Sequence, residues 1–166
     1  MSPQDTLRSW GRTVFGLLVF LLFTSAVASA AEKPVKPTAK DKCPVCGMFV
    51  YKYPDWVVQA VFRDGTRLYF DGAKDFFKFY LDPPKYLPGK ARTDIVSVWV
   101  TDYYTLESID GFQAYYVIGS DVLGPMGREL IPLAREAEAL EFLKDHKGRK
   151  IIRFRQVTPE ILKPLD

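Results

Sequence analysis

The stretch from residue 56 to residue 70 reads WVVQAVFRDGTRLYF. Its first seven residues are mostly β-branched or aromatic and favour a strand. Asp64-Gly65 is a strong two-residue hairpin signal, because the tight turn needs residues that tolerate positive φ angles. Thr66 to Phe70 supplies the returning strand. We therefore predict an antiparallel β-hairpin over residues 56–70.

A short helix is predicted directly after the hairpin. Asp71 can cap a helix from Gly72 to about Leu81, and Pro83-Pro84 ends it. The expected inner face of this helix consists of Phe76, Phe77, Tyr80 and Leu81. Residues 95–100, IVSVWV, favour a further strand. This part of the chain therefore has the order strand, strand, helix, strand.

The second half of the chain repeats this order of elements without repeating the residues. Residues 113–118 favour a strand, 119–127 a turn-rich loop and 128–132 a short return strand. An amphipathic helix over 134–146 and a last strand over 151–154 follow. The expected apolar helix face consists of Leu133, Ala137, Leu140 and Leu143. We predict an α+β fold of two ββαβ units packed side by side, residues 43–105 and 106–157, with a peripheral tail over 158–166.

The N-terminal residues have the pattern of a secretory signal. Arg8 and Arg12 precede an apolar run from Val14 to Phe23, and small residues follow as far as Ala30. This pattern predicts a signal peptide over 1–30 and a linker over 31–42. The alternative is an uncleaved segment that anchors the chain to a membrane. No cysteine directly follows the apolar run, so a lipid anchor is not predicted. We expect a periplasmic or otherwise exported protein.

Composition narrows the function classes. With 166 residues, 48% of them hydrophobic, the chain has enough apolar mass for one compact domain or two small lobes. The net charge is only +3, and no basic run accompanies an aromatic platform, which argues against nucleic-acid binding. Both cysteines lie in CPVCGM, residues 43–48. A disulfide closing so short a loop would add little stability. The cysteine pair therefore indicates a chemical role rather than a structural one.

Three hypotheses compete for the Cys43-x-x-Cys46 motif. Thiol–disulfide exchange usually needs a thiolate at a helix N-terminus, whereas residues 47–51, GMFVY, look β-like or irregular. A closed structural zinc site needs four Cys/His ligands, and the chain offers two cysteines and the distant His146. Cu(I) prefers thiolate and thioether sulfur, and two to four such ligands suffice. We favour Cu(I), with a periplasmic thiol–disulfide oxidoreductase using Cys43 and Cys46 as the alternative.

The candidate metal ligands come from two segments. Cys46 and Met48 are two residues apart and would point to the same side of an extended segment. Met126, in GPMG at 124–127, would approach from the second unit. Cys43 is a further ligand, a disulfide partner of Cys46 or a spare thiol, and the sequence leaves these open. His146 is expected at the end of a helix, outside the metal site.

Catalytic constellations do not stand out. The acids Asp71, Asp75, Asp102 and Asp121 look like cap and turn residues. A single histidine leaves little for general acid–base catalysis, so we expect a protein that is not an enzyme. A third function class is an interaction module without metal, which would use a surface patch around Trp56.

Several spaced motifs together resemble the NosL-type nitrous oxide reductase accessory proteins. They are CGM at 46–48, FRDG at 62–65, YFD at 69–71, VTDY at 100–103, YVIGS at 116–120 and GPMGREL at 124–130. The resemblance implies two ββαβ units and an exported Cu(I)-binding chaperone that helps to assemble the copper centres of nitrous oxide reductase. It implies Cys46, Met48 and Met126 as soft ligands. The implied partner is a copper-receiving client or assembly-complex protein. This chain lacks the lipoprotein cysteine of many members.

Residues 43–86 also resemble small metal-binding modules of the YHS/TRASH type. In those modules a Cys-Gly-Met start precedes an aromatic hairpin and a second cysteine pair. The corresponding positions here are Asp71 and Asp75. The resemblance therefore implies that the zinc site of that module is incomplete in this chain.

Overall fold

The computed structural model describes residues 33–166. The predicted signal peptide over 1–30 lies outside the described residues. Between residues 33 and 166, no helix combines the length and the apolar character that crossing a membrane requires.

Two antiparallel sheets form the framework. One has the strand order β2-β1-β3-β4 and the other β6-β5-β7. The strands are β1 (Val58–Phe62), β2 (Arg67–Phe70), β3 (Ile95–Thr101), β4 (Ser108–Asp110), β5 (Tyr115–Gly124), β6 (Gly127–Leu133) and β7 (Lys150–Arg153). The α-helices are α1 (Ala73–Leu81), α2 (Pro83–Tyr86), α3 (Glu136–Asp145) and α4 (Pro159–Leu162). Short 3-10 turns lie at Val50–Lys52, Pro54–Trp56, Arg92–Asp94, Phe154–Gln156 and Lys163–Leu165.

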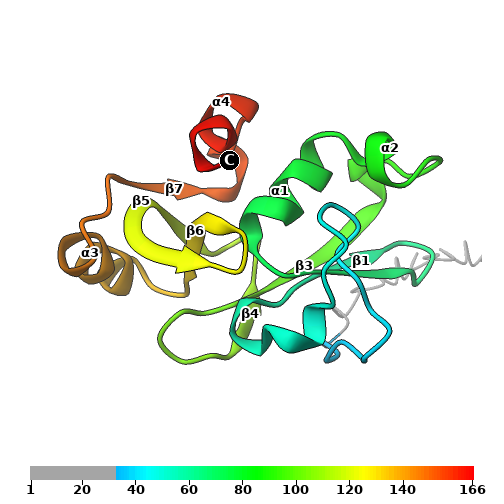
Figure 1. Ribbon diagram of the computed structural model, residues 1–166, viewed down its shortest axis with the longest axis horizontal. Helices are drawn as coiled ribbons and strands as arrows, with labels where there is room; N and C mark the ends of the chain where they lie inside the picture. Colours follow the sequence, from blue (N-terminus) through cyan, green and yellow to red (C-terminus); the bar gives the residue numbers. More distant parts are fainter. Residues whose placement is uncertain (1–32) are drawn as a thin grey trace, which may run out of the picture.

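The predicted α+β fold is confirmed. The order β1, β2, α1, β3 is followed by β5, β6, α3, β7, so the ββαβ arrangement occurs twice. In Figure 1 the sheet of β5, β6 and β7 lies on the left with α3, the strands β1 and β3 lie on the right, and α1 lies between them. The helix α1 contacts β2 and α2 of its own unit and also β6 and α4. It therefore packs against both halves of the molecule.

The first hairpin forms as predicted, although its turn is longer. Four residues, 63–66, separate β1 from β2, and the N–H of Gly65 donates to the carbonyl of Phe62 at 2.9 Å. Gly65 has φ +83°, a left-handed conformation that costs glycine little. Asp64-Gly65 is therefore part of a four-residue turn rather than a two-residue one. β4 was not predicted and extends the sheet beside β3.

The second hairpin is longer than predicted. Residues 119–124 were expected in a loop, but they belong to β5, which pairs with β6 as far as Gly124 and Gly127. The pairing register shifts between Ile118 and Leu123, where Gly119 adopts φ +77°. A β-bulge at this glycine lets the strand bend and continue. The hairpin therefore ends in the two-residue tip Pro125-Met126, at the far end of the strands from α3.

The core crosses from one unit to the other. Phe77 of α1 packs with ring centroids 5.2 Å from Tyr116 of β5 and 5.0 Å from Phe154, which follows β7. The expected inner face of α1 is only partly right, because Phe76, Phe77 and Phe79 are buried whereas Tyr80 and Leu81 are partly exposed. The two ββαβ halves thus share a large hydrophobic core, and a second, smaller core lies between α3 and the second sheet.

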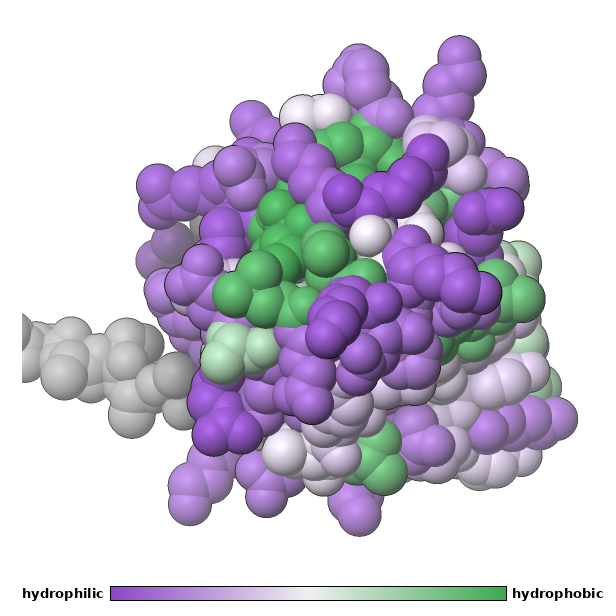
Figure 2. All heavy atoms as spheres, turned by 90° about the vertical axis from the view of Figure 1, so that its left-hand side faces the viewer, coloured by the Kyte–Doolittle hydropathy of each residue, from purple (hydrophilic) through white to green (hydrophobic). Residues whose placement is uncertain are grey.

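Two expectations about the second half need correction. Leu133 is buried and Leu143 is partly buried, as predicted, but Ala137 is exposed and Leu140 is 56% exposed. The buried residues of α3 are Ala139 and Phe142. The tail after residue 157 is not peripheral: Leu162 and Leu165 are 5% and 3% exposed within the shared core. Figure 2 looks onto the end formed by α3 and the β5–β6 hairpin, where apolar side chains gather among charged ones.

Candidate metal site

The cysteine segment forms a closed loop. The N–H of Cys43 donates to the carbonyl of Met48, and the N–H of Gly47 donates to the carbonyl of Cys43, both at 2.9 Å. Gly47 has φ +79°, so glycine suits this turn. Cys46 and Met48 therefore do not lie on an extended segment, and the argument that alternation points them to one side is wrong. Both cysteines are free thiols.

Two carboxylates complete a cluster with the thiols. The Sγ of Cys46 lies 3.1 Å from Oδ1 of Asp71, and the Sγ of Cys43 lies 3.5 Å from Oδ2 of Asp75. One ligand atom from each of these four residues lies within 4.8 Å of all the others. Within residues 33–166, this is the one group of three or more Cys, His, Asp or Glu side chains close enough to hold an ion. We call it the thiol–carboxylate cluster.

The two acids were not predicted as part of the site. Asp71 was expected to cap α1. The N-cap residue is Gly72 instead, and the N-cap residue makes no side-chain capping hydrogen bond. Asp71 faces Cys46 instead, and its other oxygen, Oδ2, is buried without a partner among the described residues. The one signal in the sequence was the resemblance to YHS/TRASH modules, whose second cysteine pair falls at positions 71 and 75. Carboxylates occupy those positions here.

Burial keeps the thiols protonated. It raises the pKa of Cys46 to about 12 and that of Cys43 further still, and the nearby Asp71 carboxylate adds to both shifts. Because the thiolate is the nucleophile in disulfide exchange, neutral thiols are poor exchange catalysts. The carboxylates favour a cation at the same place. The cluster therefore favours metal binding over thiol–disulfide chemistry.

The donor set also changes the argument about zinc. Carboxylate oxygen is an accepted zinc ligand, and two thiols with two carboxylates make four potential donors. Counting only cysteine and histidine was therefore an insufficient reason to exclude zinc. Thiolates suit soft ions, whereas carboxylates suit harder ones. The softness of the site depends on whether thioether sulfur joins the thiols.

Met126 lies at the tip of the β5–β6 hairpin with its side chain 44% exposed. Its carbonyl oxygen accepts a hydrogen bond of 2.7 Å from Nζ of Lys74, in the first turn of α1. Asp75 is in the same turn. The structure thus brings the Met126 backbone to the end of α1 that carries the carboxylates. Met48 is half-buried in the cysteine loop. The ligand roles of both methionines stay predictions.

The other polar candidates have structural partners. His146 is the residue after α3, stacks on Phe142 at 4.3 Å between centroids, and places Nδ1 3.4 Å from Oδ1 of Asp121. It is a helix-terminal residue, as predicted. Asp102 is fully buried and accepts backbone N–H groups of Tyr104, Thr105 and Ala134. This confirms it as a turn acid.

The carboxyl group of Glu129, from β6, lies at the start of α1 and accepts a backbone hydrogen bond there. Its Oε1 accepts hydrogen bonds from the backbone N–H groups of Lys74 and Leu130. A Cβ atom added at Gly72 would lie only 2.2 Å from the other carboxyl oxygen, Oε2. A side chain at residue 72 would therefore displace this carboxyl. Burial raises the pKa of Glu129 to about 8, although the two N–H donors and Lys74 oppose the shift.

Glu129→Gln should change how stability depends on pH. Between the ordinary value of 4.5 and about 8, folded Glu129 holds a proton that the unfolded chain has released. Stability from this group is therefore complete below pH 4.5 and falls as pH rises, by up to about 1.4 kcal/mol per pH unit. We expect the difference in unfolding free energy, wild type minus Glu129→Gln, to decline from pH 5 to 7.5 in urea titrations. A difference that stays constant over this range would contradict the assignment.

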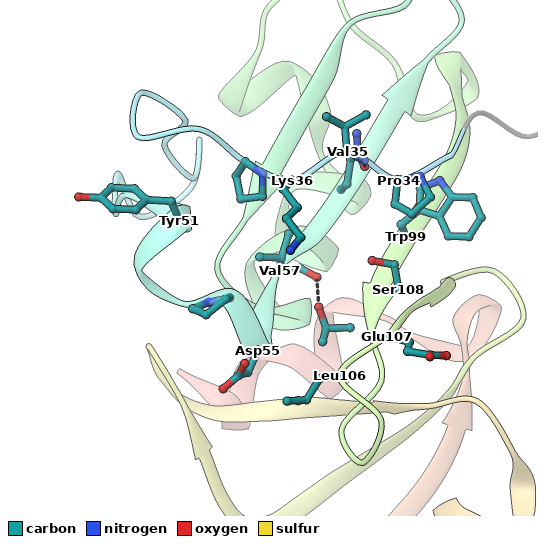
Figure 3. Close-up of a pocket in the computed structure, with 14 residues that line it drawn as sticks. Pro34, Val35, Lys36, Tyr51, Asp55, Val57, Trp99, Leu106, Glu107 and Ser108 are labelled. Atoms are coloured by element: carbon teal, nitrogen blue, oxygen red, sulfur yellow. Dashed lines mark hydrogen bonds between the residues drawn. The ribbon is translucent and has the colours of Figure 1, made fainter.

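A separate cavity of about 620 Å³ lies on the other face of the first sheet. Figure 3 shows Lys36, Val35 and Pro34 across the upper part of the cavity, with Trp99 at the right and Leu106 and Glu107 below. The N–H of Val35 donates to Oε1 of the buried Gln59 at 2.9 Å, so part of the predicted linker is fastened to the sheet. None of the cluster residues lines this cavity.

The fold and the cluster define a small α+β protein with a thiol-containing candidate metal site. The NosL family model matches residues 34–162, and the chain belongs to the NosL family. It is 31% identical over 153 residues to the copper-binding lipoprotein NosL of Stutzerimonas stutzeri, covering 88% of this chain and 78% of that protein. The crystal structure of the copper chaperone NosL from Shewanella denitrificans has a TM-score of 0.66 at 22% identity, covering 79% of this chain and 99% of that one. This last likeness shows the fold.

Proposed function

We propose that this protein is an exported Cu(I) chaperone that passes its ion to a periplasmic copper enzyme. The observation that carries the proposal is the thiol–carboxylate cluster, in which two free thiols meet two carboxylates within 4.8 Å. Membership of the NosL family and the copper-binding names of the relatives support copper as the cargo. The role is binding and transfer, without catalysis.

The proposed ligands are Cys46, Met48 and Met126, with Cys43 as a further sulfur. Thiolate and thioether are the donors that Cu(I) prefers, which favours Cu(I) over harder ions. A thioether binds without losing a proton and forms no disulfide, so it suits an oxidising compartment. Binding at Cys46 requires loss of its thiol proton, because metals coordinate the thiolate. Asp71, 3.1 Å from that sulfur, is the nearest carboxylate.

The proposed partner is a copper-receiving client or a member of its assembly complex, with nitrous oxide reductase as the client that the family resemblance implies. We place the protein in the periplasm, released by cleavage after Ala30 or attached through an uncleaved N-terminal segment. The thiol–disulfide oxidoreductase alternative is disfavoured, because the raised pKa values of both cysteines leave little thiolate at neutral pH.

Met126→Ala tests the ligand set. Removing one of three soft ligands should weaken Cu(I) binding by about 30-fold, or ~2 kcal/mol. The measurement is an anaerobic competition titration against a chromogenic Cu(I) chelator. Leu123→Ala is the matched control, because Leu123 is 63% exposed on the same hairpin and offers no ligand atom. Equal affinities for the two variants would remove Met126 from the site.

A further inference from the structure

Lys74 is a buried lysine whose ammonium group donates to backbone carbonyls rather than to a carboxylate. The residue is 3% exposed, and among the described residues no carboxylate lies within 4.0 Å of its ammonium group. Nζ donates instead to two backbone carbonyls, that of Met126 at 2.7 Å and that of Leu165 at 2.9 Å. Burying a charge is costly, so a lysine whose acceptors are two main-chain oxygens fixes the position of those segments.

Two segments of the chain, the cysteine loop and the β5–β6 hairpin, reach the start of α1. The cysteine loop reaches the start of α1 through Asp71 and Asp75, and the β5–β6 hairpin reaches the same helix end through Lys74. A second hydrogen bond from Lys74, by its backbone N–H to Oε1 of Glu129, fastens β6 to the same turn. The hairpin is therefore held at its tip and at the base of that tip, three residues apart.

We propose that Lys74 is the positioning residue that holds Met126 beside the thiol–carboxylate cluster. This proposal rests on the proposed function, because Lys74 can position a metal ligand only if Met126 is one. A neutral thioether is a weak donor, so its contribution to affinity depends on being held in place before the ion arrives. Lys74 fixes the Met126 backbone while the side chain stays 44% exposed. The Leu165 carbonyl, as second acceptor, locks the ammonium in place.

The test is a double-mutant cycle between Lys74→Leu and Met126→Ala. Leucine removes the donor without adding sulfur or charge. We expect Lys74→Leu to weaken Cu(I) binding about tenfold, within the range typical of residues that orient a ligand. The double variant should bind no more weakly than Met126→Ala alone, because both changes remove the same ligand. X-ray absorption at the copper edge should give one sulfur fewer for each variant.

Lys85→Leu is the matched control. Lys85 is an exposed lysine of α2, and its ammonium lies over the ring of Tyr86 rather than against the cluster or the hairpin. Its replacement should leave affinity and sulfur count unchanged. Lys74→Gln, which removes the charge and shortens the side chain but keeps two amide N–H donors, serves as a second variant if Lys74→Leu does not fold. Circular dichroism on each apo protein shows that the titrated chain is folded.

The outcomes separate the two proposals. If Met126→Ala lowers affinity while Lys74→Leu and Lys74→Gln leave both affinity and sulfur count at wild-type values, the positioning role is overturned and the ligand set stands. Additive losses in the cycle would also overturn it, because Lys74 would then act independently of Met126. If Met126→Ala changes neither quantity, the ligand set fails and the positioning role falls with it.

Discussion

Cys46→Ser should lower the affinity for Cu(I) by about a thousandfold, or ~4 kcal/mol. Serine has nearly the same shape, but its alcohol does not ionise at neutral pH and is a hard donor that Cu(I) disfavours. The hydroxyl can still donate to Oδ1 of Asp71, as the thiol does at 3.1 Å. The fold should therefore persist, and the lower affinity should reflect the lost metal ligand rather than unfolding.

Anaerobic competition with a Cu(I) chelator measures this loss, and the unfolding midpoint of the apo protein checks the fold. Cys43→Ser is the companion variant, because Cys43 is 1% exposed and faces Asp75 in the same cluster. A similar loss would make Cys43 a ligand, whereas wild-type affinity would make it a spare thiol. Affinity of Cys46→Ser within about threefold of wild type would refute the sulfur site.

Phe77→Ala should cost about 3–5 kcal/mol of unfolding free energy, as expected for a large buried aromatic side chain. Phe77 is fully buried, and its ring contacts Phe76, Tyr80, Tyr116 and Phe154. Tyr116 and Phe154 belong to the second ββαβ unit, so the cavity would open where the two halves meet. A single cooperative transition should remain, at lower denaturant concentration.

Leu140→Ala is the control for this prediction. Leu140 is 56% exposed on α3, although the sequence pattern had placed it on the buried face. Its replacement should change the unfolding free energy by about 0.5 kcal/mol or less. Urea titrations followed by circular dichroism compare the two variants. A loss above about 2 kcal/mol for Leu140→Ala, or a loss below that for Phe77→Ala, would contradict the packing described above.

Local patterns predicted the elements better than they predicted their burial. Strand alternation and the Asp64-Gly65 turn indicated the first hairpin correctly, because both signals are local. The face of α3 was predicted only in part, because the buried residues Ala139 and Phe142 lie beside the predicted Leu143 rather than on the side of Leu140. The buried tail was missed because Leu162 and Leu165 lie in two short turns that acquire a buried face only against the rest of the fold.

The candidate site was predicted in part for the same reason. Cys43 and Cys46 could be predicted as candidates because two cysteines three residues apart are visible in the sequence itself. Their carboxylate partners lie 25 and 32 residues further along the chain, and aspartate next to a helix start has a common alternative role as a cap. The Lys74 tether spans 52 residues and ends on a backbone carbonyl, so no residue type marks its acceptor.

The protonated thiols have an electrical consequence for cargo exchange. With the pKa of Cys46 at about 12, the empty cluster carries a proton where the proposed site would carry Cu⁺. If Cys46 alone loses its proton, exchanging that proton for Cu⁺ leaves the total charge of the cluster unchanged. A divalent ion entering at the cost of one proton would add a unit of positive charge. Release of the ion would return the proton to Cys46, so we expect acidification to favour release.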